Sequence, residues 1–171
     1  MDPAVSYGGF CMTSARAIRV FPFLALSLLF FAVLPSVLTR AQNSTDPWPA
    51  TQTVQAPDFA KELADHTSAP TVLFVGFQRL YTAGHIKAAQ YHGSAGGAEG
   101  LAEIKKWAGG VPRSTNLVLY CGCCPMEQCP NLRPAFAALH EMGFTKVRVL
   151  ILPSSFAVDW VEKGLPYEKG Q

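Results

Sequence analysis

The chain has 171 residues and a formal net charge of +2, from 14 lysines and arginines against 12 aspartates and glutamates. Three of those arginines and one of the aspartates lie within residues 1–41, so the rest of the chain is neutral. A neutral domain lacks the basic face or stripe that binds nucleic acid, and a nucleic-acid partner is therefore not expected. The length suits one domain with an appendage.

The appendage is expected at the N-terminus. Arg16 and Arg19 precede an apolar stretch, residues 20–34, and Thr39-x-Ala41 places small residues where signal peptidase cleaves. A basic segment, a short apolar core and such a site are typical of a secretory signal peptide. We expect residues 1–41 to be removed on export, which leaves a periplasmic or secreted protein. The alternative is an uncleaved membrane anchor formed by residues 20–38, since a spanning helix needs about 20 apolar residues.

The rest of the chain divides into a polar tether, residues 42–55, and a domain, residues 56–171. Within the domain, the runs TVLFV and LVLY are apolar throughout, as in strands buried on both faces of a parallel sheet. Strands that alternate with helices indicate an α/β fold with helices on both faces of the sheet. The expected strands are 71–75, 117–120 and 146–152, and the expected helices are 57–64, 101–108, 131–142 and 156–163.

Four cysteines follow the second of these strands: Cys121, Cys123, Cys124 and Cys129. Cys121 comes directly after the strand, at the carboxyl end where ligand sites collect in open α/β sheets. The loop leads into a helix that Asn131 is expected to cap. Backbone N–H groups at such a helix start hold anions and lower the pKa of a nearby thiol. This environment suits a nucleophilic thiolate at Cys121.

Other uses of these thiols remain open. Cys121, Cys124 and Cys129 have spacings that can reach one zinc or cuprous ion, although no second pair of ligands is visible in the sequence. The C-x-x-C spacing of Cys121 and Cys124 is also that of redox-active disulfides, and thiols outside the cytosol tend to become oxidised. The plainest interpretation is a buried cysteine that only completes a strand.

Several segments, taken in order, resemble a rhodanese-like (sulfurtransferase) domain. YTAGHIKAA (81–89) is similar to the family's Tyr-x-x-Gly-His-Ile-Pro-Gly-Ala, and VLYC (118–121) to the strand that leads to the catalytic cysteine. RPAFAAL (133–139) resembles the helix after the active loop, and WVEKGLP (160–166) the closing Trp-x-x-x-Gly-x-Pro. The resemblance covers residues 53–170 and implies a rhodanese-like α/β fold, a five-stranded, mainly parallel sheet flanked by helices on both faces.

The resemblance also implies a chemistry. Cys121 would take a sulfane sulfur from a small donor such as thiosulfate, become a persulfide and pass the sulfur to a thiol or other acceptor. Beyond the resemblance, Cys123, Cys124 or Cys129 is expected to resolve the persulfide as a disulfide, and Arg133 either contacts the anion or lies solvated on the helix surface. No cofactor is implied, and the partners are a small sulfur-containing donor and a thiol acceptor. The alternative is a non-catalytic module whose loop binds a soft metal or is held by redox-active disulfides.

The sequence departs from the family pattern around this loop. The loop is longer than usual and carries Glu127, whose carboxylate would repel thiosulfate if it pointed inward. Val75-Gly76-Phe77 stands where the family has Asp-x-Arg, and Ser154-Ser155 replaces a glycine pair. His85 is expected to fix the Gly84 turn through hydrogen bonds rather than to take part in catalysis.

Overall fold

The computed structural model of the protein describes residues 46–65 and 69–170. The signal peptide or anchor expected within residues 1–41 lies outside the described residues. None of the helices in the described ranges is long and apolar enough to cross a membrane.

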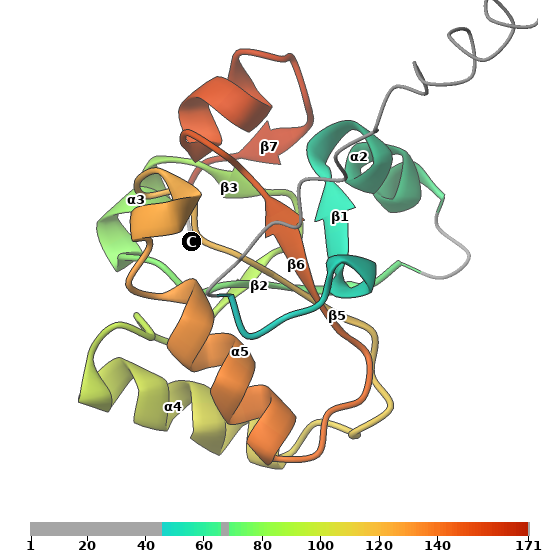
Figure 1. The fold of residues 1–171 in the computed structure, drawn as a ribbon. Coiled ribbons are helices and arrows are strands. Elements are labelled where there is room, and N and C mark those ends of the chain that lie inside the picture. Colours follow the sequence, from blue (N-terminus) through green and yellow to red (C-terminus); the bar gives the residue numbers. More distant parts are fainter. Residues whose placement is uncertain (1–45, 66–68, 171) are drawn as a thin grey trace, which may run out of the picture. The chain divides into compact units, whose positions relative to one another are not determined.

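Five parallel strands form the central sheet, as the resemblance implies (Figure 1). Each strand pairs with its neighbour in the same direction, and the connections between them cross over the faces of the sheet. The order across the sheet is β1 (Thr53–Gln55), β6 (Val147–Ile151), β5 (Leu117–Tyr120), β2 (Thr71–Phe74) and β4 (Gln90–Tyr91).

The middle of the sheet is its most apolar part. All four residues of β5 are buried, and β5 has a parallel neighbour on each side. A strand covered on both faces has no polar side, which explains why LVLY shows a continuous apolar run instead of alternation.

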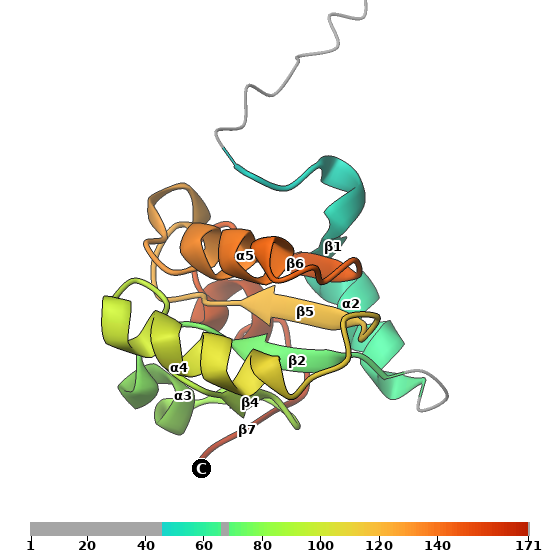
Figure 2. The same ribbon diagram turned by 90° about the horizontal axis from the view of Figure 1, so that it is seen from below.

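Helices cover both faces of this sheet. Figure 2 shows α4 and α5 side by side along one face, where they pack on a core that includes Leu73, Leu119 and Val149. The opposite core, around Phe59 and Trp160, is formed by α2 and the segment near η3. The helical elements are η1 (Ala50–Gln52), α2 (Ala56–Ala64), α3 (Gln78–Ala83), α4 (Ala98–Gly109), η2 (Met126–Gln128), α5 (Leu132–Glu141) and η3 (Ala157–Val161).

The alternation of side chains along β5 decides where Cys121 lies. Leu117 and Leu119 belong to the core under α4 and α5, whereas Val118 and Tyr120 belong to the opposite core. Side chains two positions apart in a strand share a face. Cys121 therefore joins the core under α4 and α5 and faces the start of α5.

The tether prediction is wrong for residues 48–55. Trp48 is only 5% exposed, and its ring meets Phe136 of α5 edge to face at 5.4 Å. Residues 53–55 form β1, which pairs with β6 at the edge of the sheet. A large apolar side chain and a row of free backbone groups both gain from joining the domain, although the surrounding sequence is polar.

Two smaller differences concern a short strand pair outside the central sheet and the last helix. β3 (His85–Ile86) and β7 (Tyr167–Glu168) pair as a short antiparallel ribbon that the sequence did not predict. The helix expected over 156–163 is shorter, a single wide π turn at η3. The expected helices over 57–64 and 101–108 and the strands 71–75, 117–120 and 146–152 are confirmed, each within three residues at its ends.

Candidate active site

The cysteine loop, residues 121–130, is held against the segment that follows β6. The N–H of Phe156 donates to the carbonyl of Gly122 at 3.0 Å, and the N–H of Met126 donates to the carbonyl of Pro153 at 3.1 Å. Gly122 has φ +67°, and a Cβ there would lie 2.7 Å from the backbone nitrogen of Phe156. Glycine is needed at this position both for the left-handed backbone and for the close approach.

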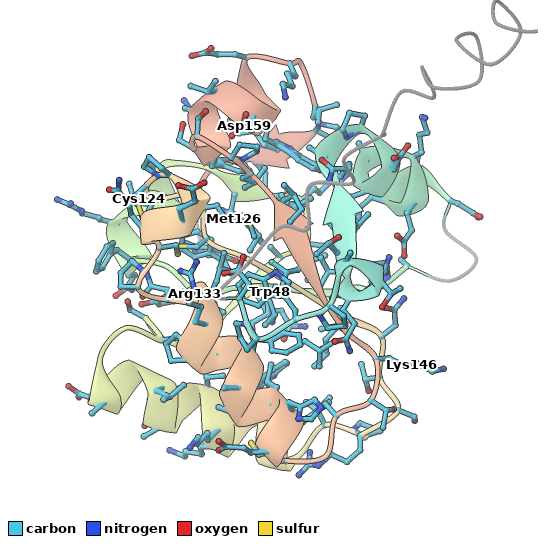
Figure 3. The ribbon with its side chains drawn as sticks, in the orientation of Figure 1. Trp48, Cys124, Met126, Arg133, Lys146 and Asp159 are labelled. Atoms are coloured by element: carbon cyan, nitrogen blue, oxygen red, sulfur yellow. The ribbon has the colours of Figure 1, made fainter. Side chains whose placement is uncertain are left out.

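The second half of the loop forms η2, which positions Cys129. The N–H of Cys129 donates to the carbonyl of Met126 at 3.2 Å, and α5 begins three residues later. Figure 3 shows Met126 at the start of η2 and Cys124 just before it, above the start of α5. The short turn brings Cys129 back toward the strand end where Cys121 lies.

The four thiols lie close together. The Sγ atoms of Cys121 and Cys123 are 3.1 Å apart, and those of Cys123 and Cys124 are 3.2 Å apart. The sulfurs of Cys121, Cys123 and Cys129 all lie within 4.8 Å of one another. All four are free thiols; Cys121 and Cys129 are buried, whereas Cys123 and Cys124 are half-buried. The cluster therefore runs from a partly accessible end at Cys124 to a buried end.

Asn131 joins this cluster to a neighbouring loop. Its side chain is fully buried, and its Nδ2 donates to the sulfurs of Cys121 at 3.4 Å and Cys123 at 3.7 Å. Its Oδ1 accepts from the hydroxyl of Ser94 at 2.9 Å and from the N–H of Gly96 at 2.8 Å. The expected capping bond is not made, since the side chain does not bond to the first turn of α5. Sequence reasoning named this residue but missed its role.

Hydrogen bonding divides the thiols into a thiolate and its proton donor. The pKa of Cys129 is lowered to about 6, first by a hydrogen bond from Cys121 and then, against the effect of burial, by the N–H groups of Asn131 and Leu132. The same hydrogen bond, together with burial, raises the pKa of Cys121. Burial and the neighbouring Cys123 raise the pKa of Cys124 to about 12. The hydrogen bond therefore favours the anion at Cys129, beside the start of α5, over the anion at Cys121.

Gly76 forms the opposite wall of the sulfur cluster. A Cβ at this position would lie 2.9 Å from the sulfur of Cys121 and 2.6 Å from the ring of Phe74. This residue belongs to the Val75-Gly76-Phe77 segment that replaces the family's Asp-x-Arg. Gly76 stands at the unspecified middle position of that motif, and glycine there leaves room for the buried sulfur.

Arg133 was expected to contact the anion of the site or solvent, but its guanidinium is bound to other groups. Its guanidinium makes an ion pair with Asp46 at 2.6 Å, donates to the carbonyl of Cys129 at 3.2 Å and lies over the ring of Trp48 (Figure 3). These contacts fasten the N-terminal segment and the loop to α5. The side chain is part of the scaffold of the site.

Two further residues that the sequence analysis named, Glu127 and His85, have other surroundings than the cysteine sulfurs. Glu127 is exposed on η2. His85 is buried, donates from Nδ1 to the carbonyl of Tyr81 at 2.8 Å and stacks on the Tyr81 ring, while its Nε2 lies 3.4 Å from Glu168. The hydrogen-bonding role predicted for His85 beside the Gly84 turn is thus observed.

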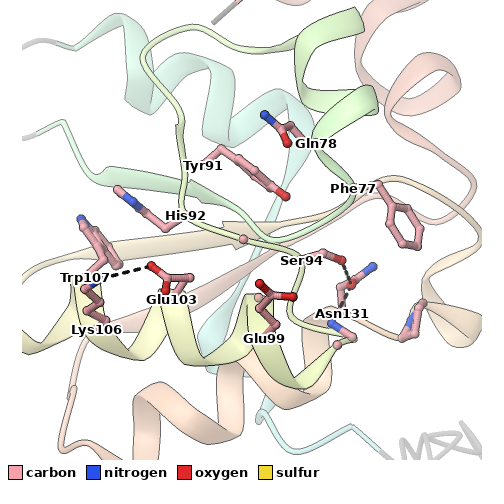
Figure 4. A pocket seen from close by; sticks show the side chains of 15 residues that line it. Phe77, Gln78, Tyr91, His92, Ser94, Glu99, Glu103, Lys106, Trp107 and Asn131 are labelled. Carbon is pink, nitrogen blue, oxygen red and sulfur yellow. Dashed lines mark hydrogen bonds and ion pairs between the residues drawn. The ribbon is translucent and has the colours of Figure 1, made fainter.

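A pocket of about 1010 Å³ borders the cluster on the side of Asn131. Figure 4 shows its wall of stacked rings, His92 and Trp107, whose centroids are 4.6 Å apart, and the side chains of Ser94 and Asn131 at the other end. Burial lowers the pKa of His92, which favours the neutral ring. Asn131 is the element shared by the pocket and the sulfurs. The other lining residues are Phe77, Gln78, Tyr91, Gly93, Gly96, Gly97, Glu99, Gly100, Glu103, Lys106 and Pro130.

Solved structures share the fold of this chain. The rhodanese-like domain of an Anabaena protein superimposes with a TM-score of 0.52 at 22% identity, over 69% of this chain and 79% of that one. A Bacillus halodurans protein gives 0.54 at 18% identity (68% and 76%), and a Lactobacillus plantarum protein 0.53 at 17% (70% and 88%). No protein-family model and no curated protein matches the chain. The fold is that of a rhodanese-like domain, and the cysteine cluster lies at the carboxyl end of its central strand.

Proposed function

We propose that the protein is an exported sulfurtransferase-type domain that takes a sulfane sulfur onto Cys121 and hands it to a thiol acceptor. One observation carries the proposal. In a rhodanese-like fold, the sulfur that directly follows the central strand is in hydrogen-bonding contact with other thiols. Such an arrangement provides a nucleophile together with a base and a resolving group.

The first step loads the sulfur. The Sγ of Cys121 attacks the outer sulfur of thiosulfate, a polysulfide or a persulfide while its proton passes to Cys129 along the hydrogen bond between them, because at rest that bond keeps the proton on Cys121. The sulfur–sulfur bond of the donor breaks, its electron pair leaves with sulfite or with the shortened polysulfide or thiolate, and Cys121 becomes a persulfide. The Nδ2 of Asn131 and the N–H of Cys123, which both face this sulfur, would stabilise the anion.

The second step passes the sulfur on. An external thiolate attacks the terminal sulfur and regenerates the Cys121 thiolate. Without an acceptor, the thiolate of Cys123, whose sulfur lies 3.1 Å away, attacks the Sγ of Cys121, releases hydrosulfide and leaves a Cys121–Cys123 disulfide. A small external thiol then reduces that disulfide. Cys124, half-buried beside Cys123, offers the accessible end for this exchange.

Export forms part of the proposal. The basic residues, apolar stretch and Thr39-x-Ala41 pattern support a signal peptide over residues 1–41. Outside the cytosol the resting state of the loop would depend on a supply of reducing thiols. Intact-mass measurement of protein from its own compartment should therefore show a chain that begins at Gln42, whereas retained residues 20–38 would favour an anchor.

The test of the function uses reduced, metal-free protein that begins at Gln42. Incubation with thiosulfate, polysulfide or a low-molecular-weight persulfide should produce sulfane sulfur on the protein and transfer it to an added thiol. Cys121→Ser should abolish loading, whereas Cys124→Ser, which alters a sulfur at the accessible end, should load normally. Wild-type protein that stays unmodified by all three donors would leave the non-catalytic module as the function.

A further inference from the structure

Three of the loop sulfurs form a triangle that no step of sulfur transfer requires as a unit. Among the described residues, Cys121, Cys123 and Cys129 form a group in which every sulfur lies within 4.8 Å of the other two. We propose that this triangle is a binding site for one cuprous ion, with Cys124 outside it. The inference depends on the positions of the sulfurs and not on the sulfurtransferase reaction.

The size of the triangle fits a three-coordinate ion. Metal–thiolate bonds of about 2.3 Å place the sulfurs of a trigonal site roughly 4 Å apart. The edge between Cys121 and Cys123 is 3.1 Å and must open by about 1 Å, whereas no edge exceeds 4.8 Å. Side-chain rotations of a half-buried Cys123 can supply this change without moving the strand end that holds Cys121.

The number and kind of ligands favour copper(I) over zinc. Zinc in structural sites is bound by four ligands in a tetrahedron. Cys124 lies beside Cys123 but outside the group of three, and the group contains no histidine or carboxylate. A group of three thiolates suits a soft monovalent ion, and cuprous ion is among the metals that soft thiolate ligands select.

The surroundings of the triangle suit a buried anionic cluster. Three thiolates and one cuprous ion leave excess negative charge, which needs hydrogen-bond donors. The Nδ2 of Asn131 points at Cys121 and Cys123, and the N–H groups of Asn131 and Leu132 face Cys129. Outer partners of this kind orient metal ligands and tune the site.

The burial of the sulfurs indicates a direction of entry. Cys121 and Cys129 are 1% and 3% exposed, so the ion would be shielded from water on that side. Cys123 and Cys124 are half-buried, with their sulfurs 3.2 Å apart. The incoming ion would therefore approach from the side of Cys123, the accessible corner of the triangle.

The test compares two neighbouring cysteines. Reduced protein is titrated anaerobically with cuprous ion against a coloured cuprous chelator, and the thiolate-to-copper absorption in the ultraviolet is followed. Wild-type protein should bind one ion per chain. Cys123→Ser should weaken binding by more than about 100-fold, beyond the 10–100-fold that loss of an outer partner costs. Cys124→Ser, the matched control, should bind within about threefold of wild type.

Two outcomes would overturn the proposal. Equal losses in Cys123→Ser and Cys124→Ser would mean that the loop captures copper without the triangle. Wild-type protein that fails to compete with the chelator, or binds several ions without a defined end point, would mean that no site is formed. Circular dichroism of each apo variant checks folding, and Cys129→Ser replaces Cys123→Ser in the comparison if the latter does not fold.

Discussion

Replacements of Asn131 should distinguish its contribution to the stability of the site from its contribution to sulfur loading. Its Oδ1 accepts two hydrogen bonds, from Ser94 and Gly96, and its Nδ2 donates to two sulfurs. Each of these four hydrogen bonds contributes about 0.5–1 kcal/mol. Asn131→Ala should therefore lower the free energy of unfolding by about 2–4 kcal/mol.

Asn131→Asp keeps the shape of the side chain and the acceptor for Ser94 and Gly96. The atom that faces Cys121 and Cys123 becomes a carboxyl oxygen, which repels a thiolate when ionised and offers at most one hydrogen when protonated. We expect a smaller loss of stability than in Asn131→Ala, together with slower persulfide loading of Cys121.

Urea unfolding would measure the stability of each variant, and the initial rate of sulfane-sulfur loading would measure the site. Asn116→Ala is the matched control, because Asn116 is a partly buried asparagine that accepts from Arg148 at the opposite end of β5 from Cys121. It should change stability without changing the loading rate. Loading at the wild-type rate in Asn131→Asp would refute the role assigned to the amide.

Three further predictions test the wall of the site, a pH-dependent ion pair and the N-terminal segment. Gly76→Ala should destabilise the domain by about 1–3 kcal/mol in urea, since its Cβ would lie 2.9 Å from the sulfur of Cys121; an unchanged midpoint would contradict the tight wall. The hydrogen bonds from Arg148 lower the pKa of Glu62 below its ordinary 4.5. Because the folded-state pKa is the lower one, wild type should be more stable than Glu62→Gln above pH 4.5, and the difference should shrink as pH falls through the folded-state pKa; a difference independent of pH would rule this out. Trp48→Ala should cost about 3–5 kcal/mol by differential scanning calorimetry or urea unfolding, whereas a tether would predict no loss.

The sheet could be predicted because its central strands are buried on both faces and are therefore apolar at nearly every position. The run at β5 is apolar at every position, and its alternation then fixes the face on which Cys121 lies. The same reasoning failed at β1, which is three residues long and has one apolar residue, Val54, between two polar ones. Its pairing with β6 depends on a partner nearly a hundred residues away, and no local pattern signals that partner.

The candidate site could be predicted only in part. The position of Cys121 follows from the strand before it, but the contact between Cys121 and Cys129 depends on how the loop folds back through η2. Spacing suggested Cys121, Cys124 and Cys129 as a set of ligands, whereas the fold brings Cys123 into the triangle. The role of Asn131 could not be predicted for the same reason. An asparagine before a helix suggests a cap, and only the packing of the 94–96 loop gives its side chain a different partner.

The central claim is that Cys121 receives the sulfur first. Reduced, metal-free protein given one equivalent of a sulfane donor should be quenched by rapid alkylation at increasing times and mapped cysteine by cysteine by mass spectrometry. The account predicts an early product with one added sulfur on Cys121, followed, when no acceptor thiol is present, by a Cys121–Cys123 disulfide and released hydrosulfide. A sulfur that is found first on Cys124 or Cys129, or an early disulfide without any persulfide on Cys121, would contradict it.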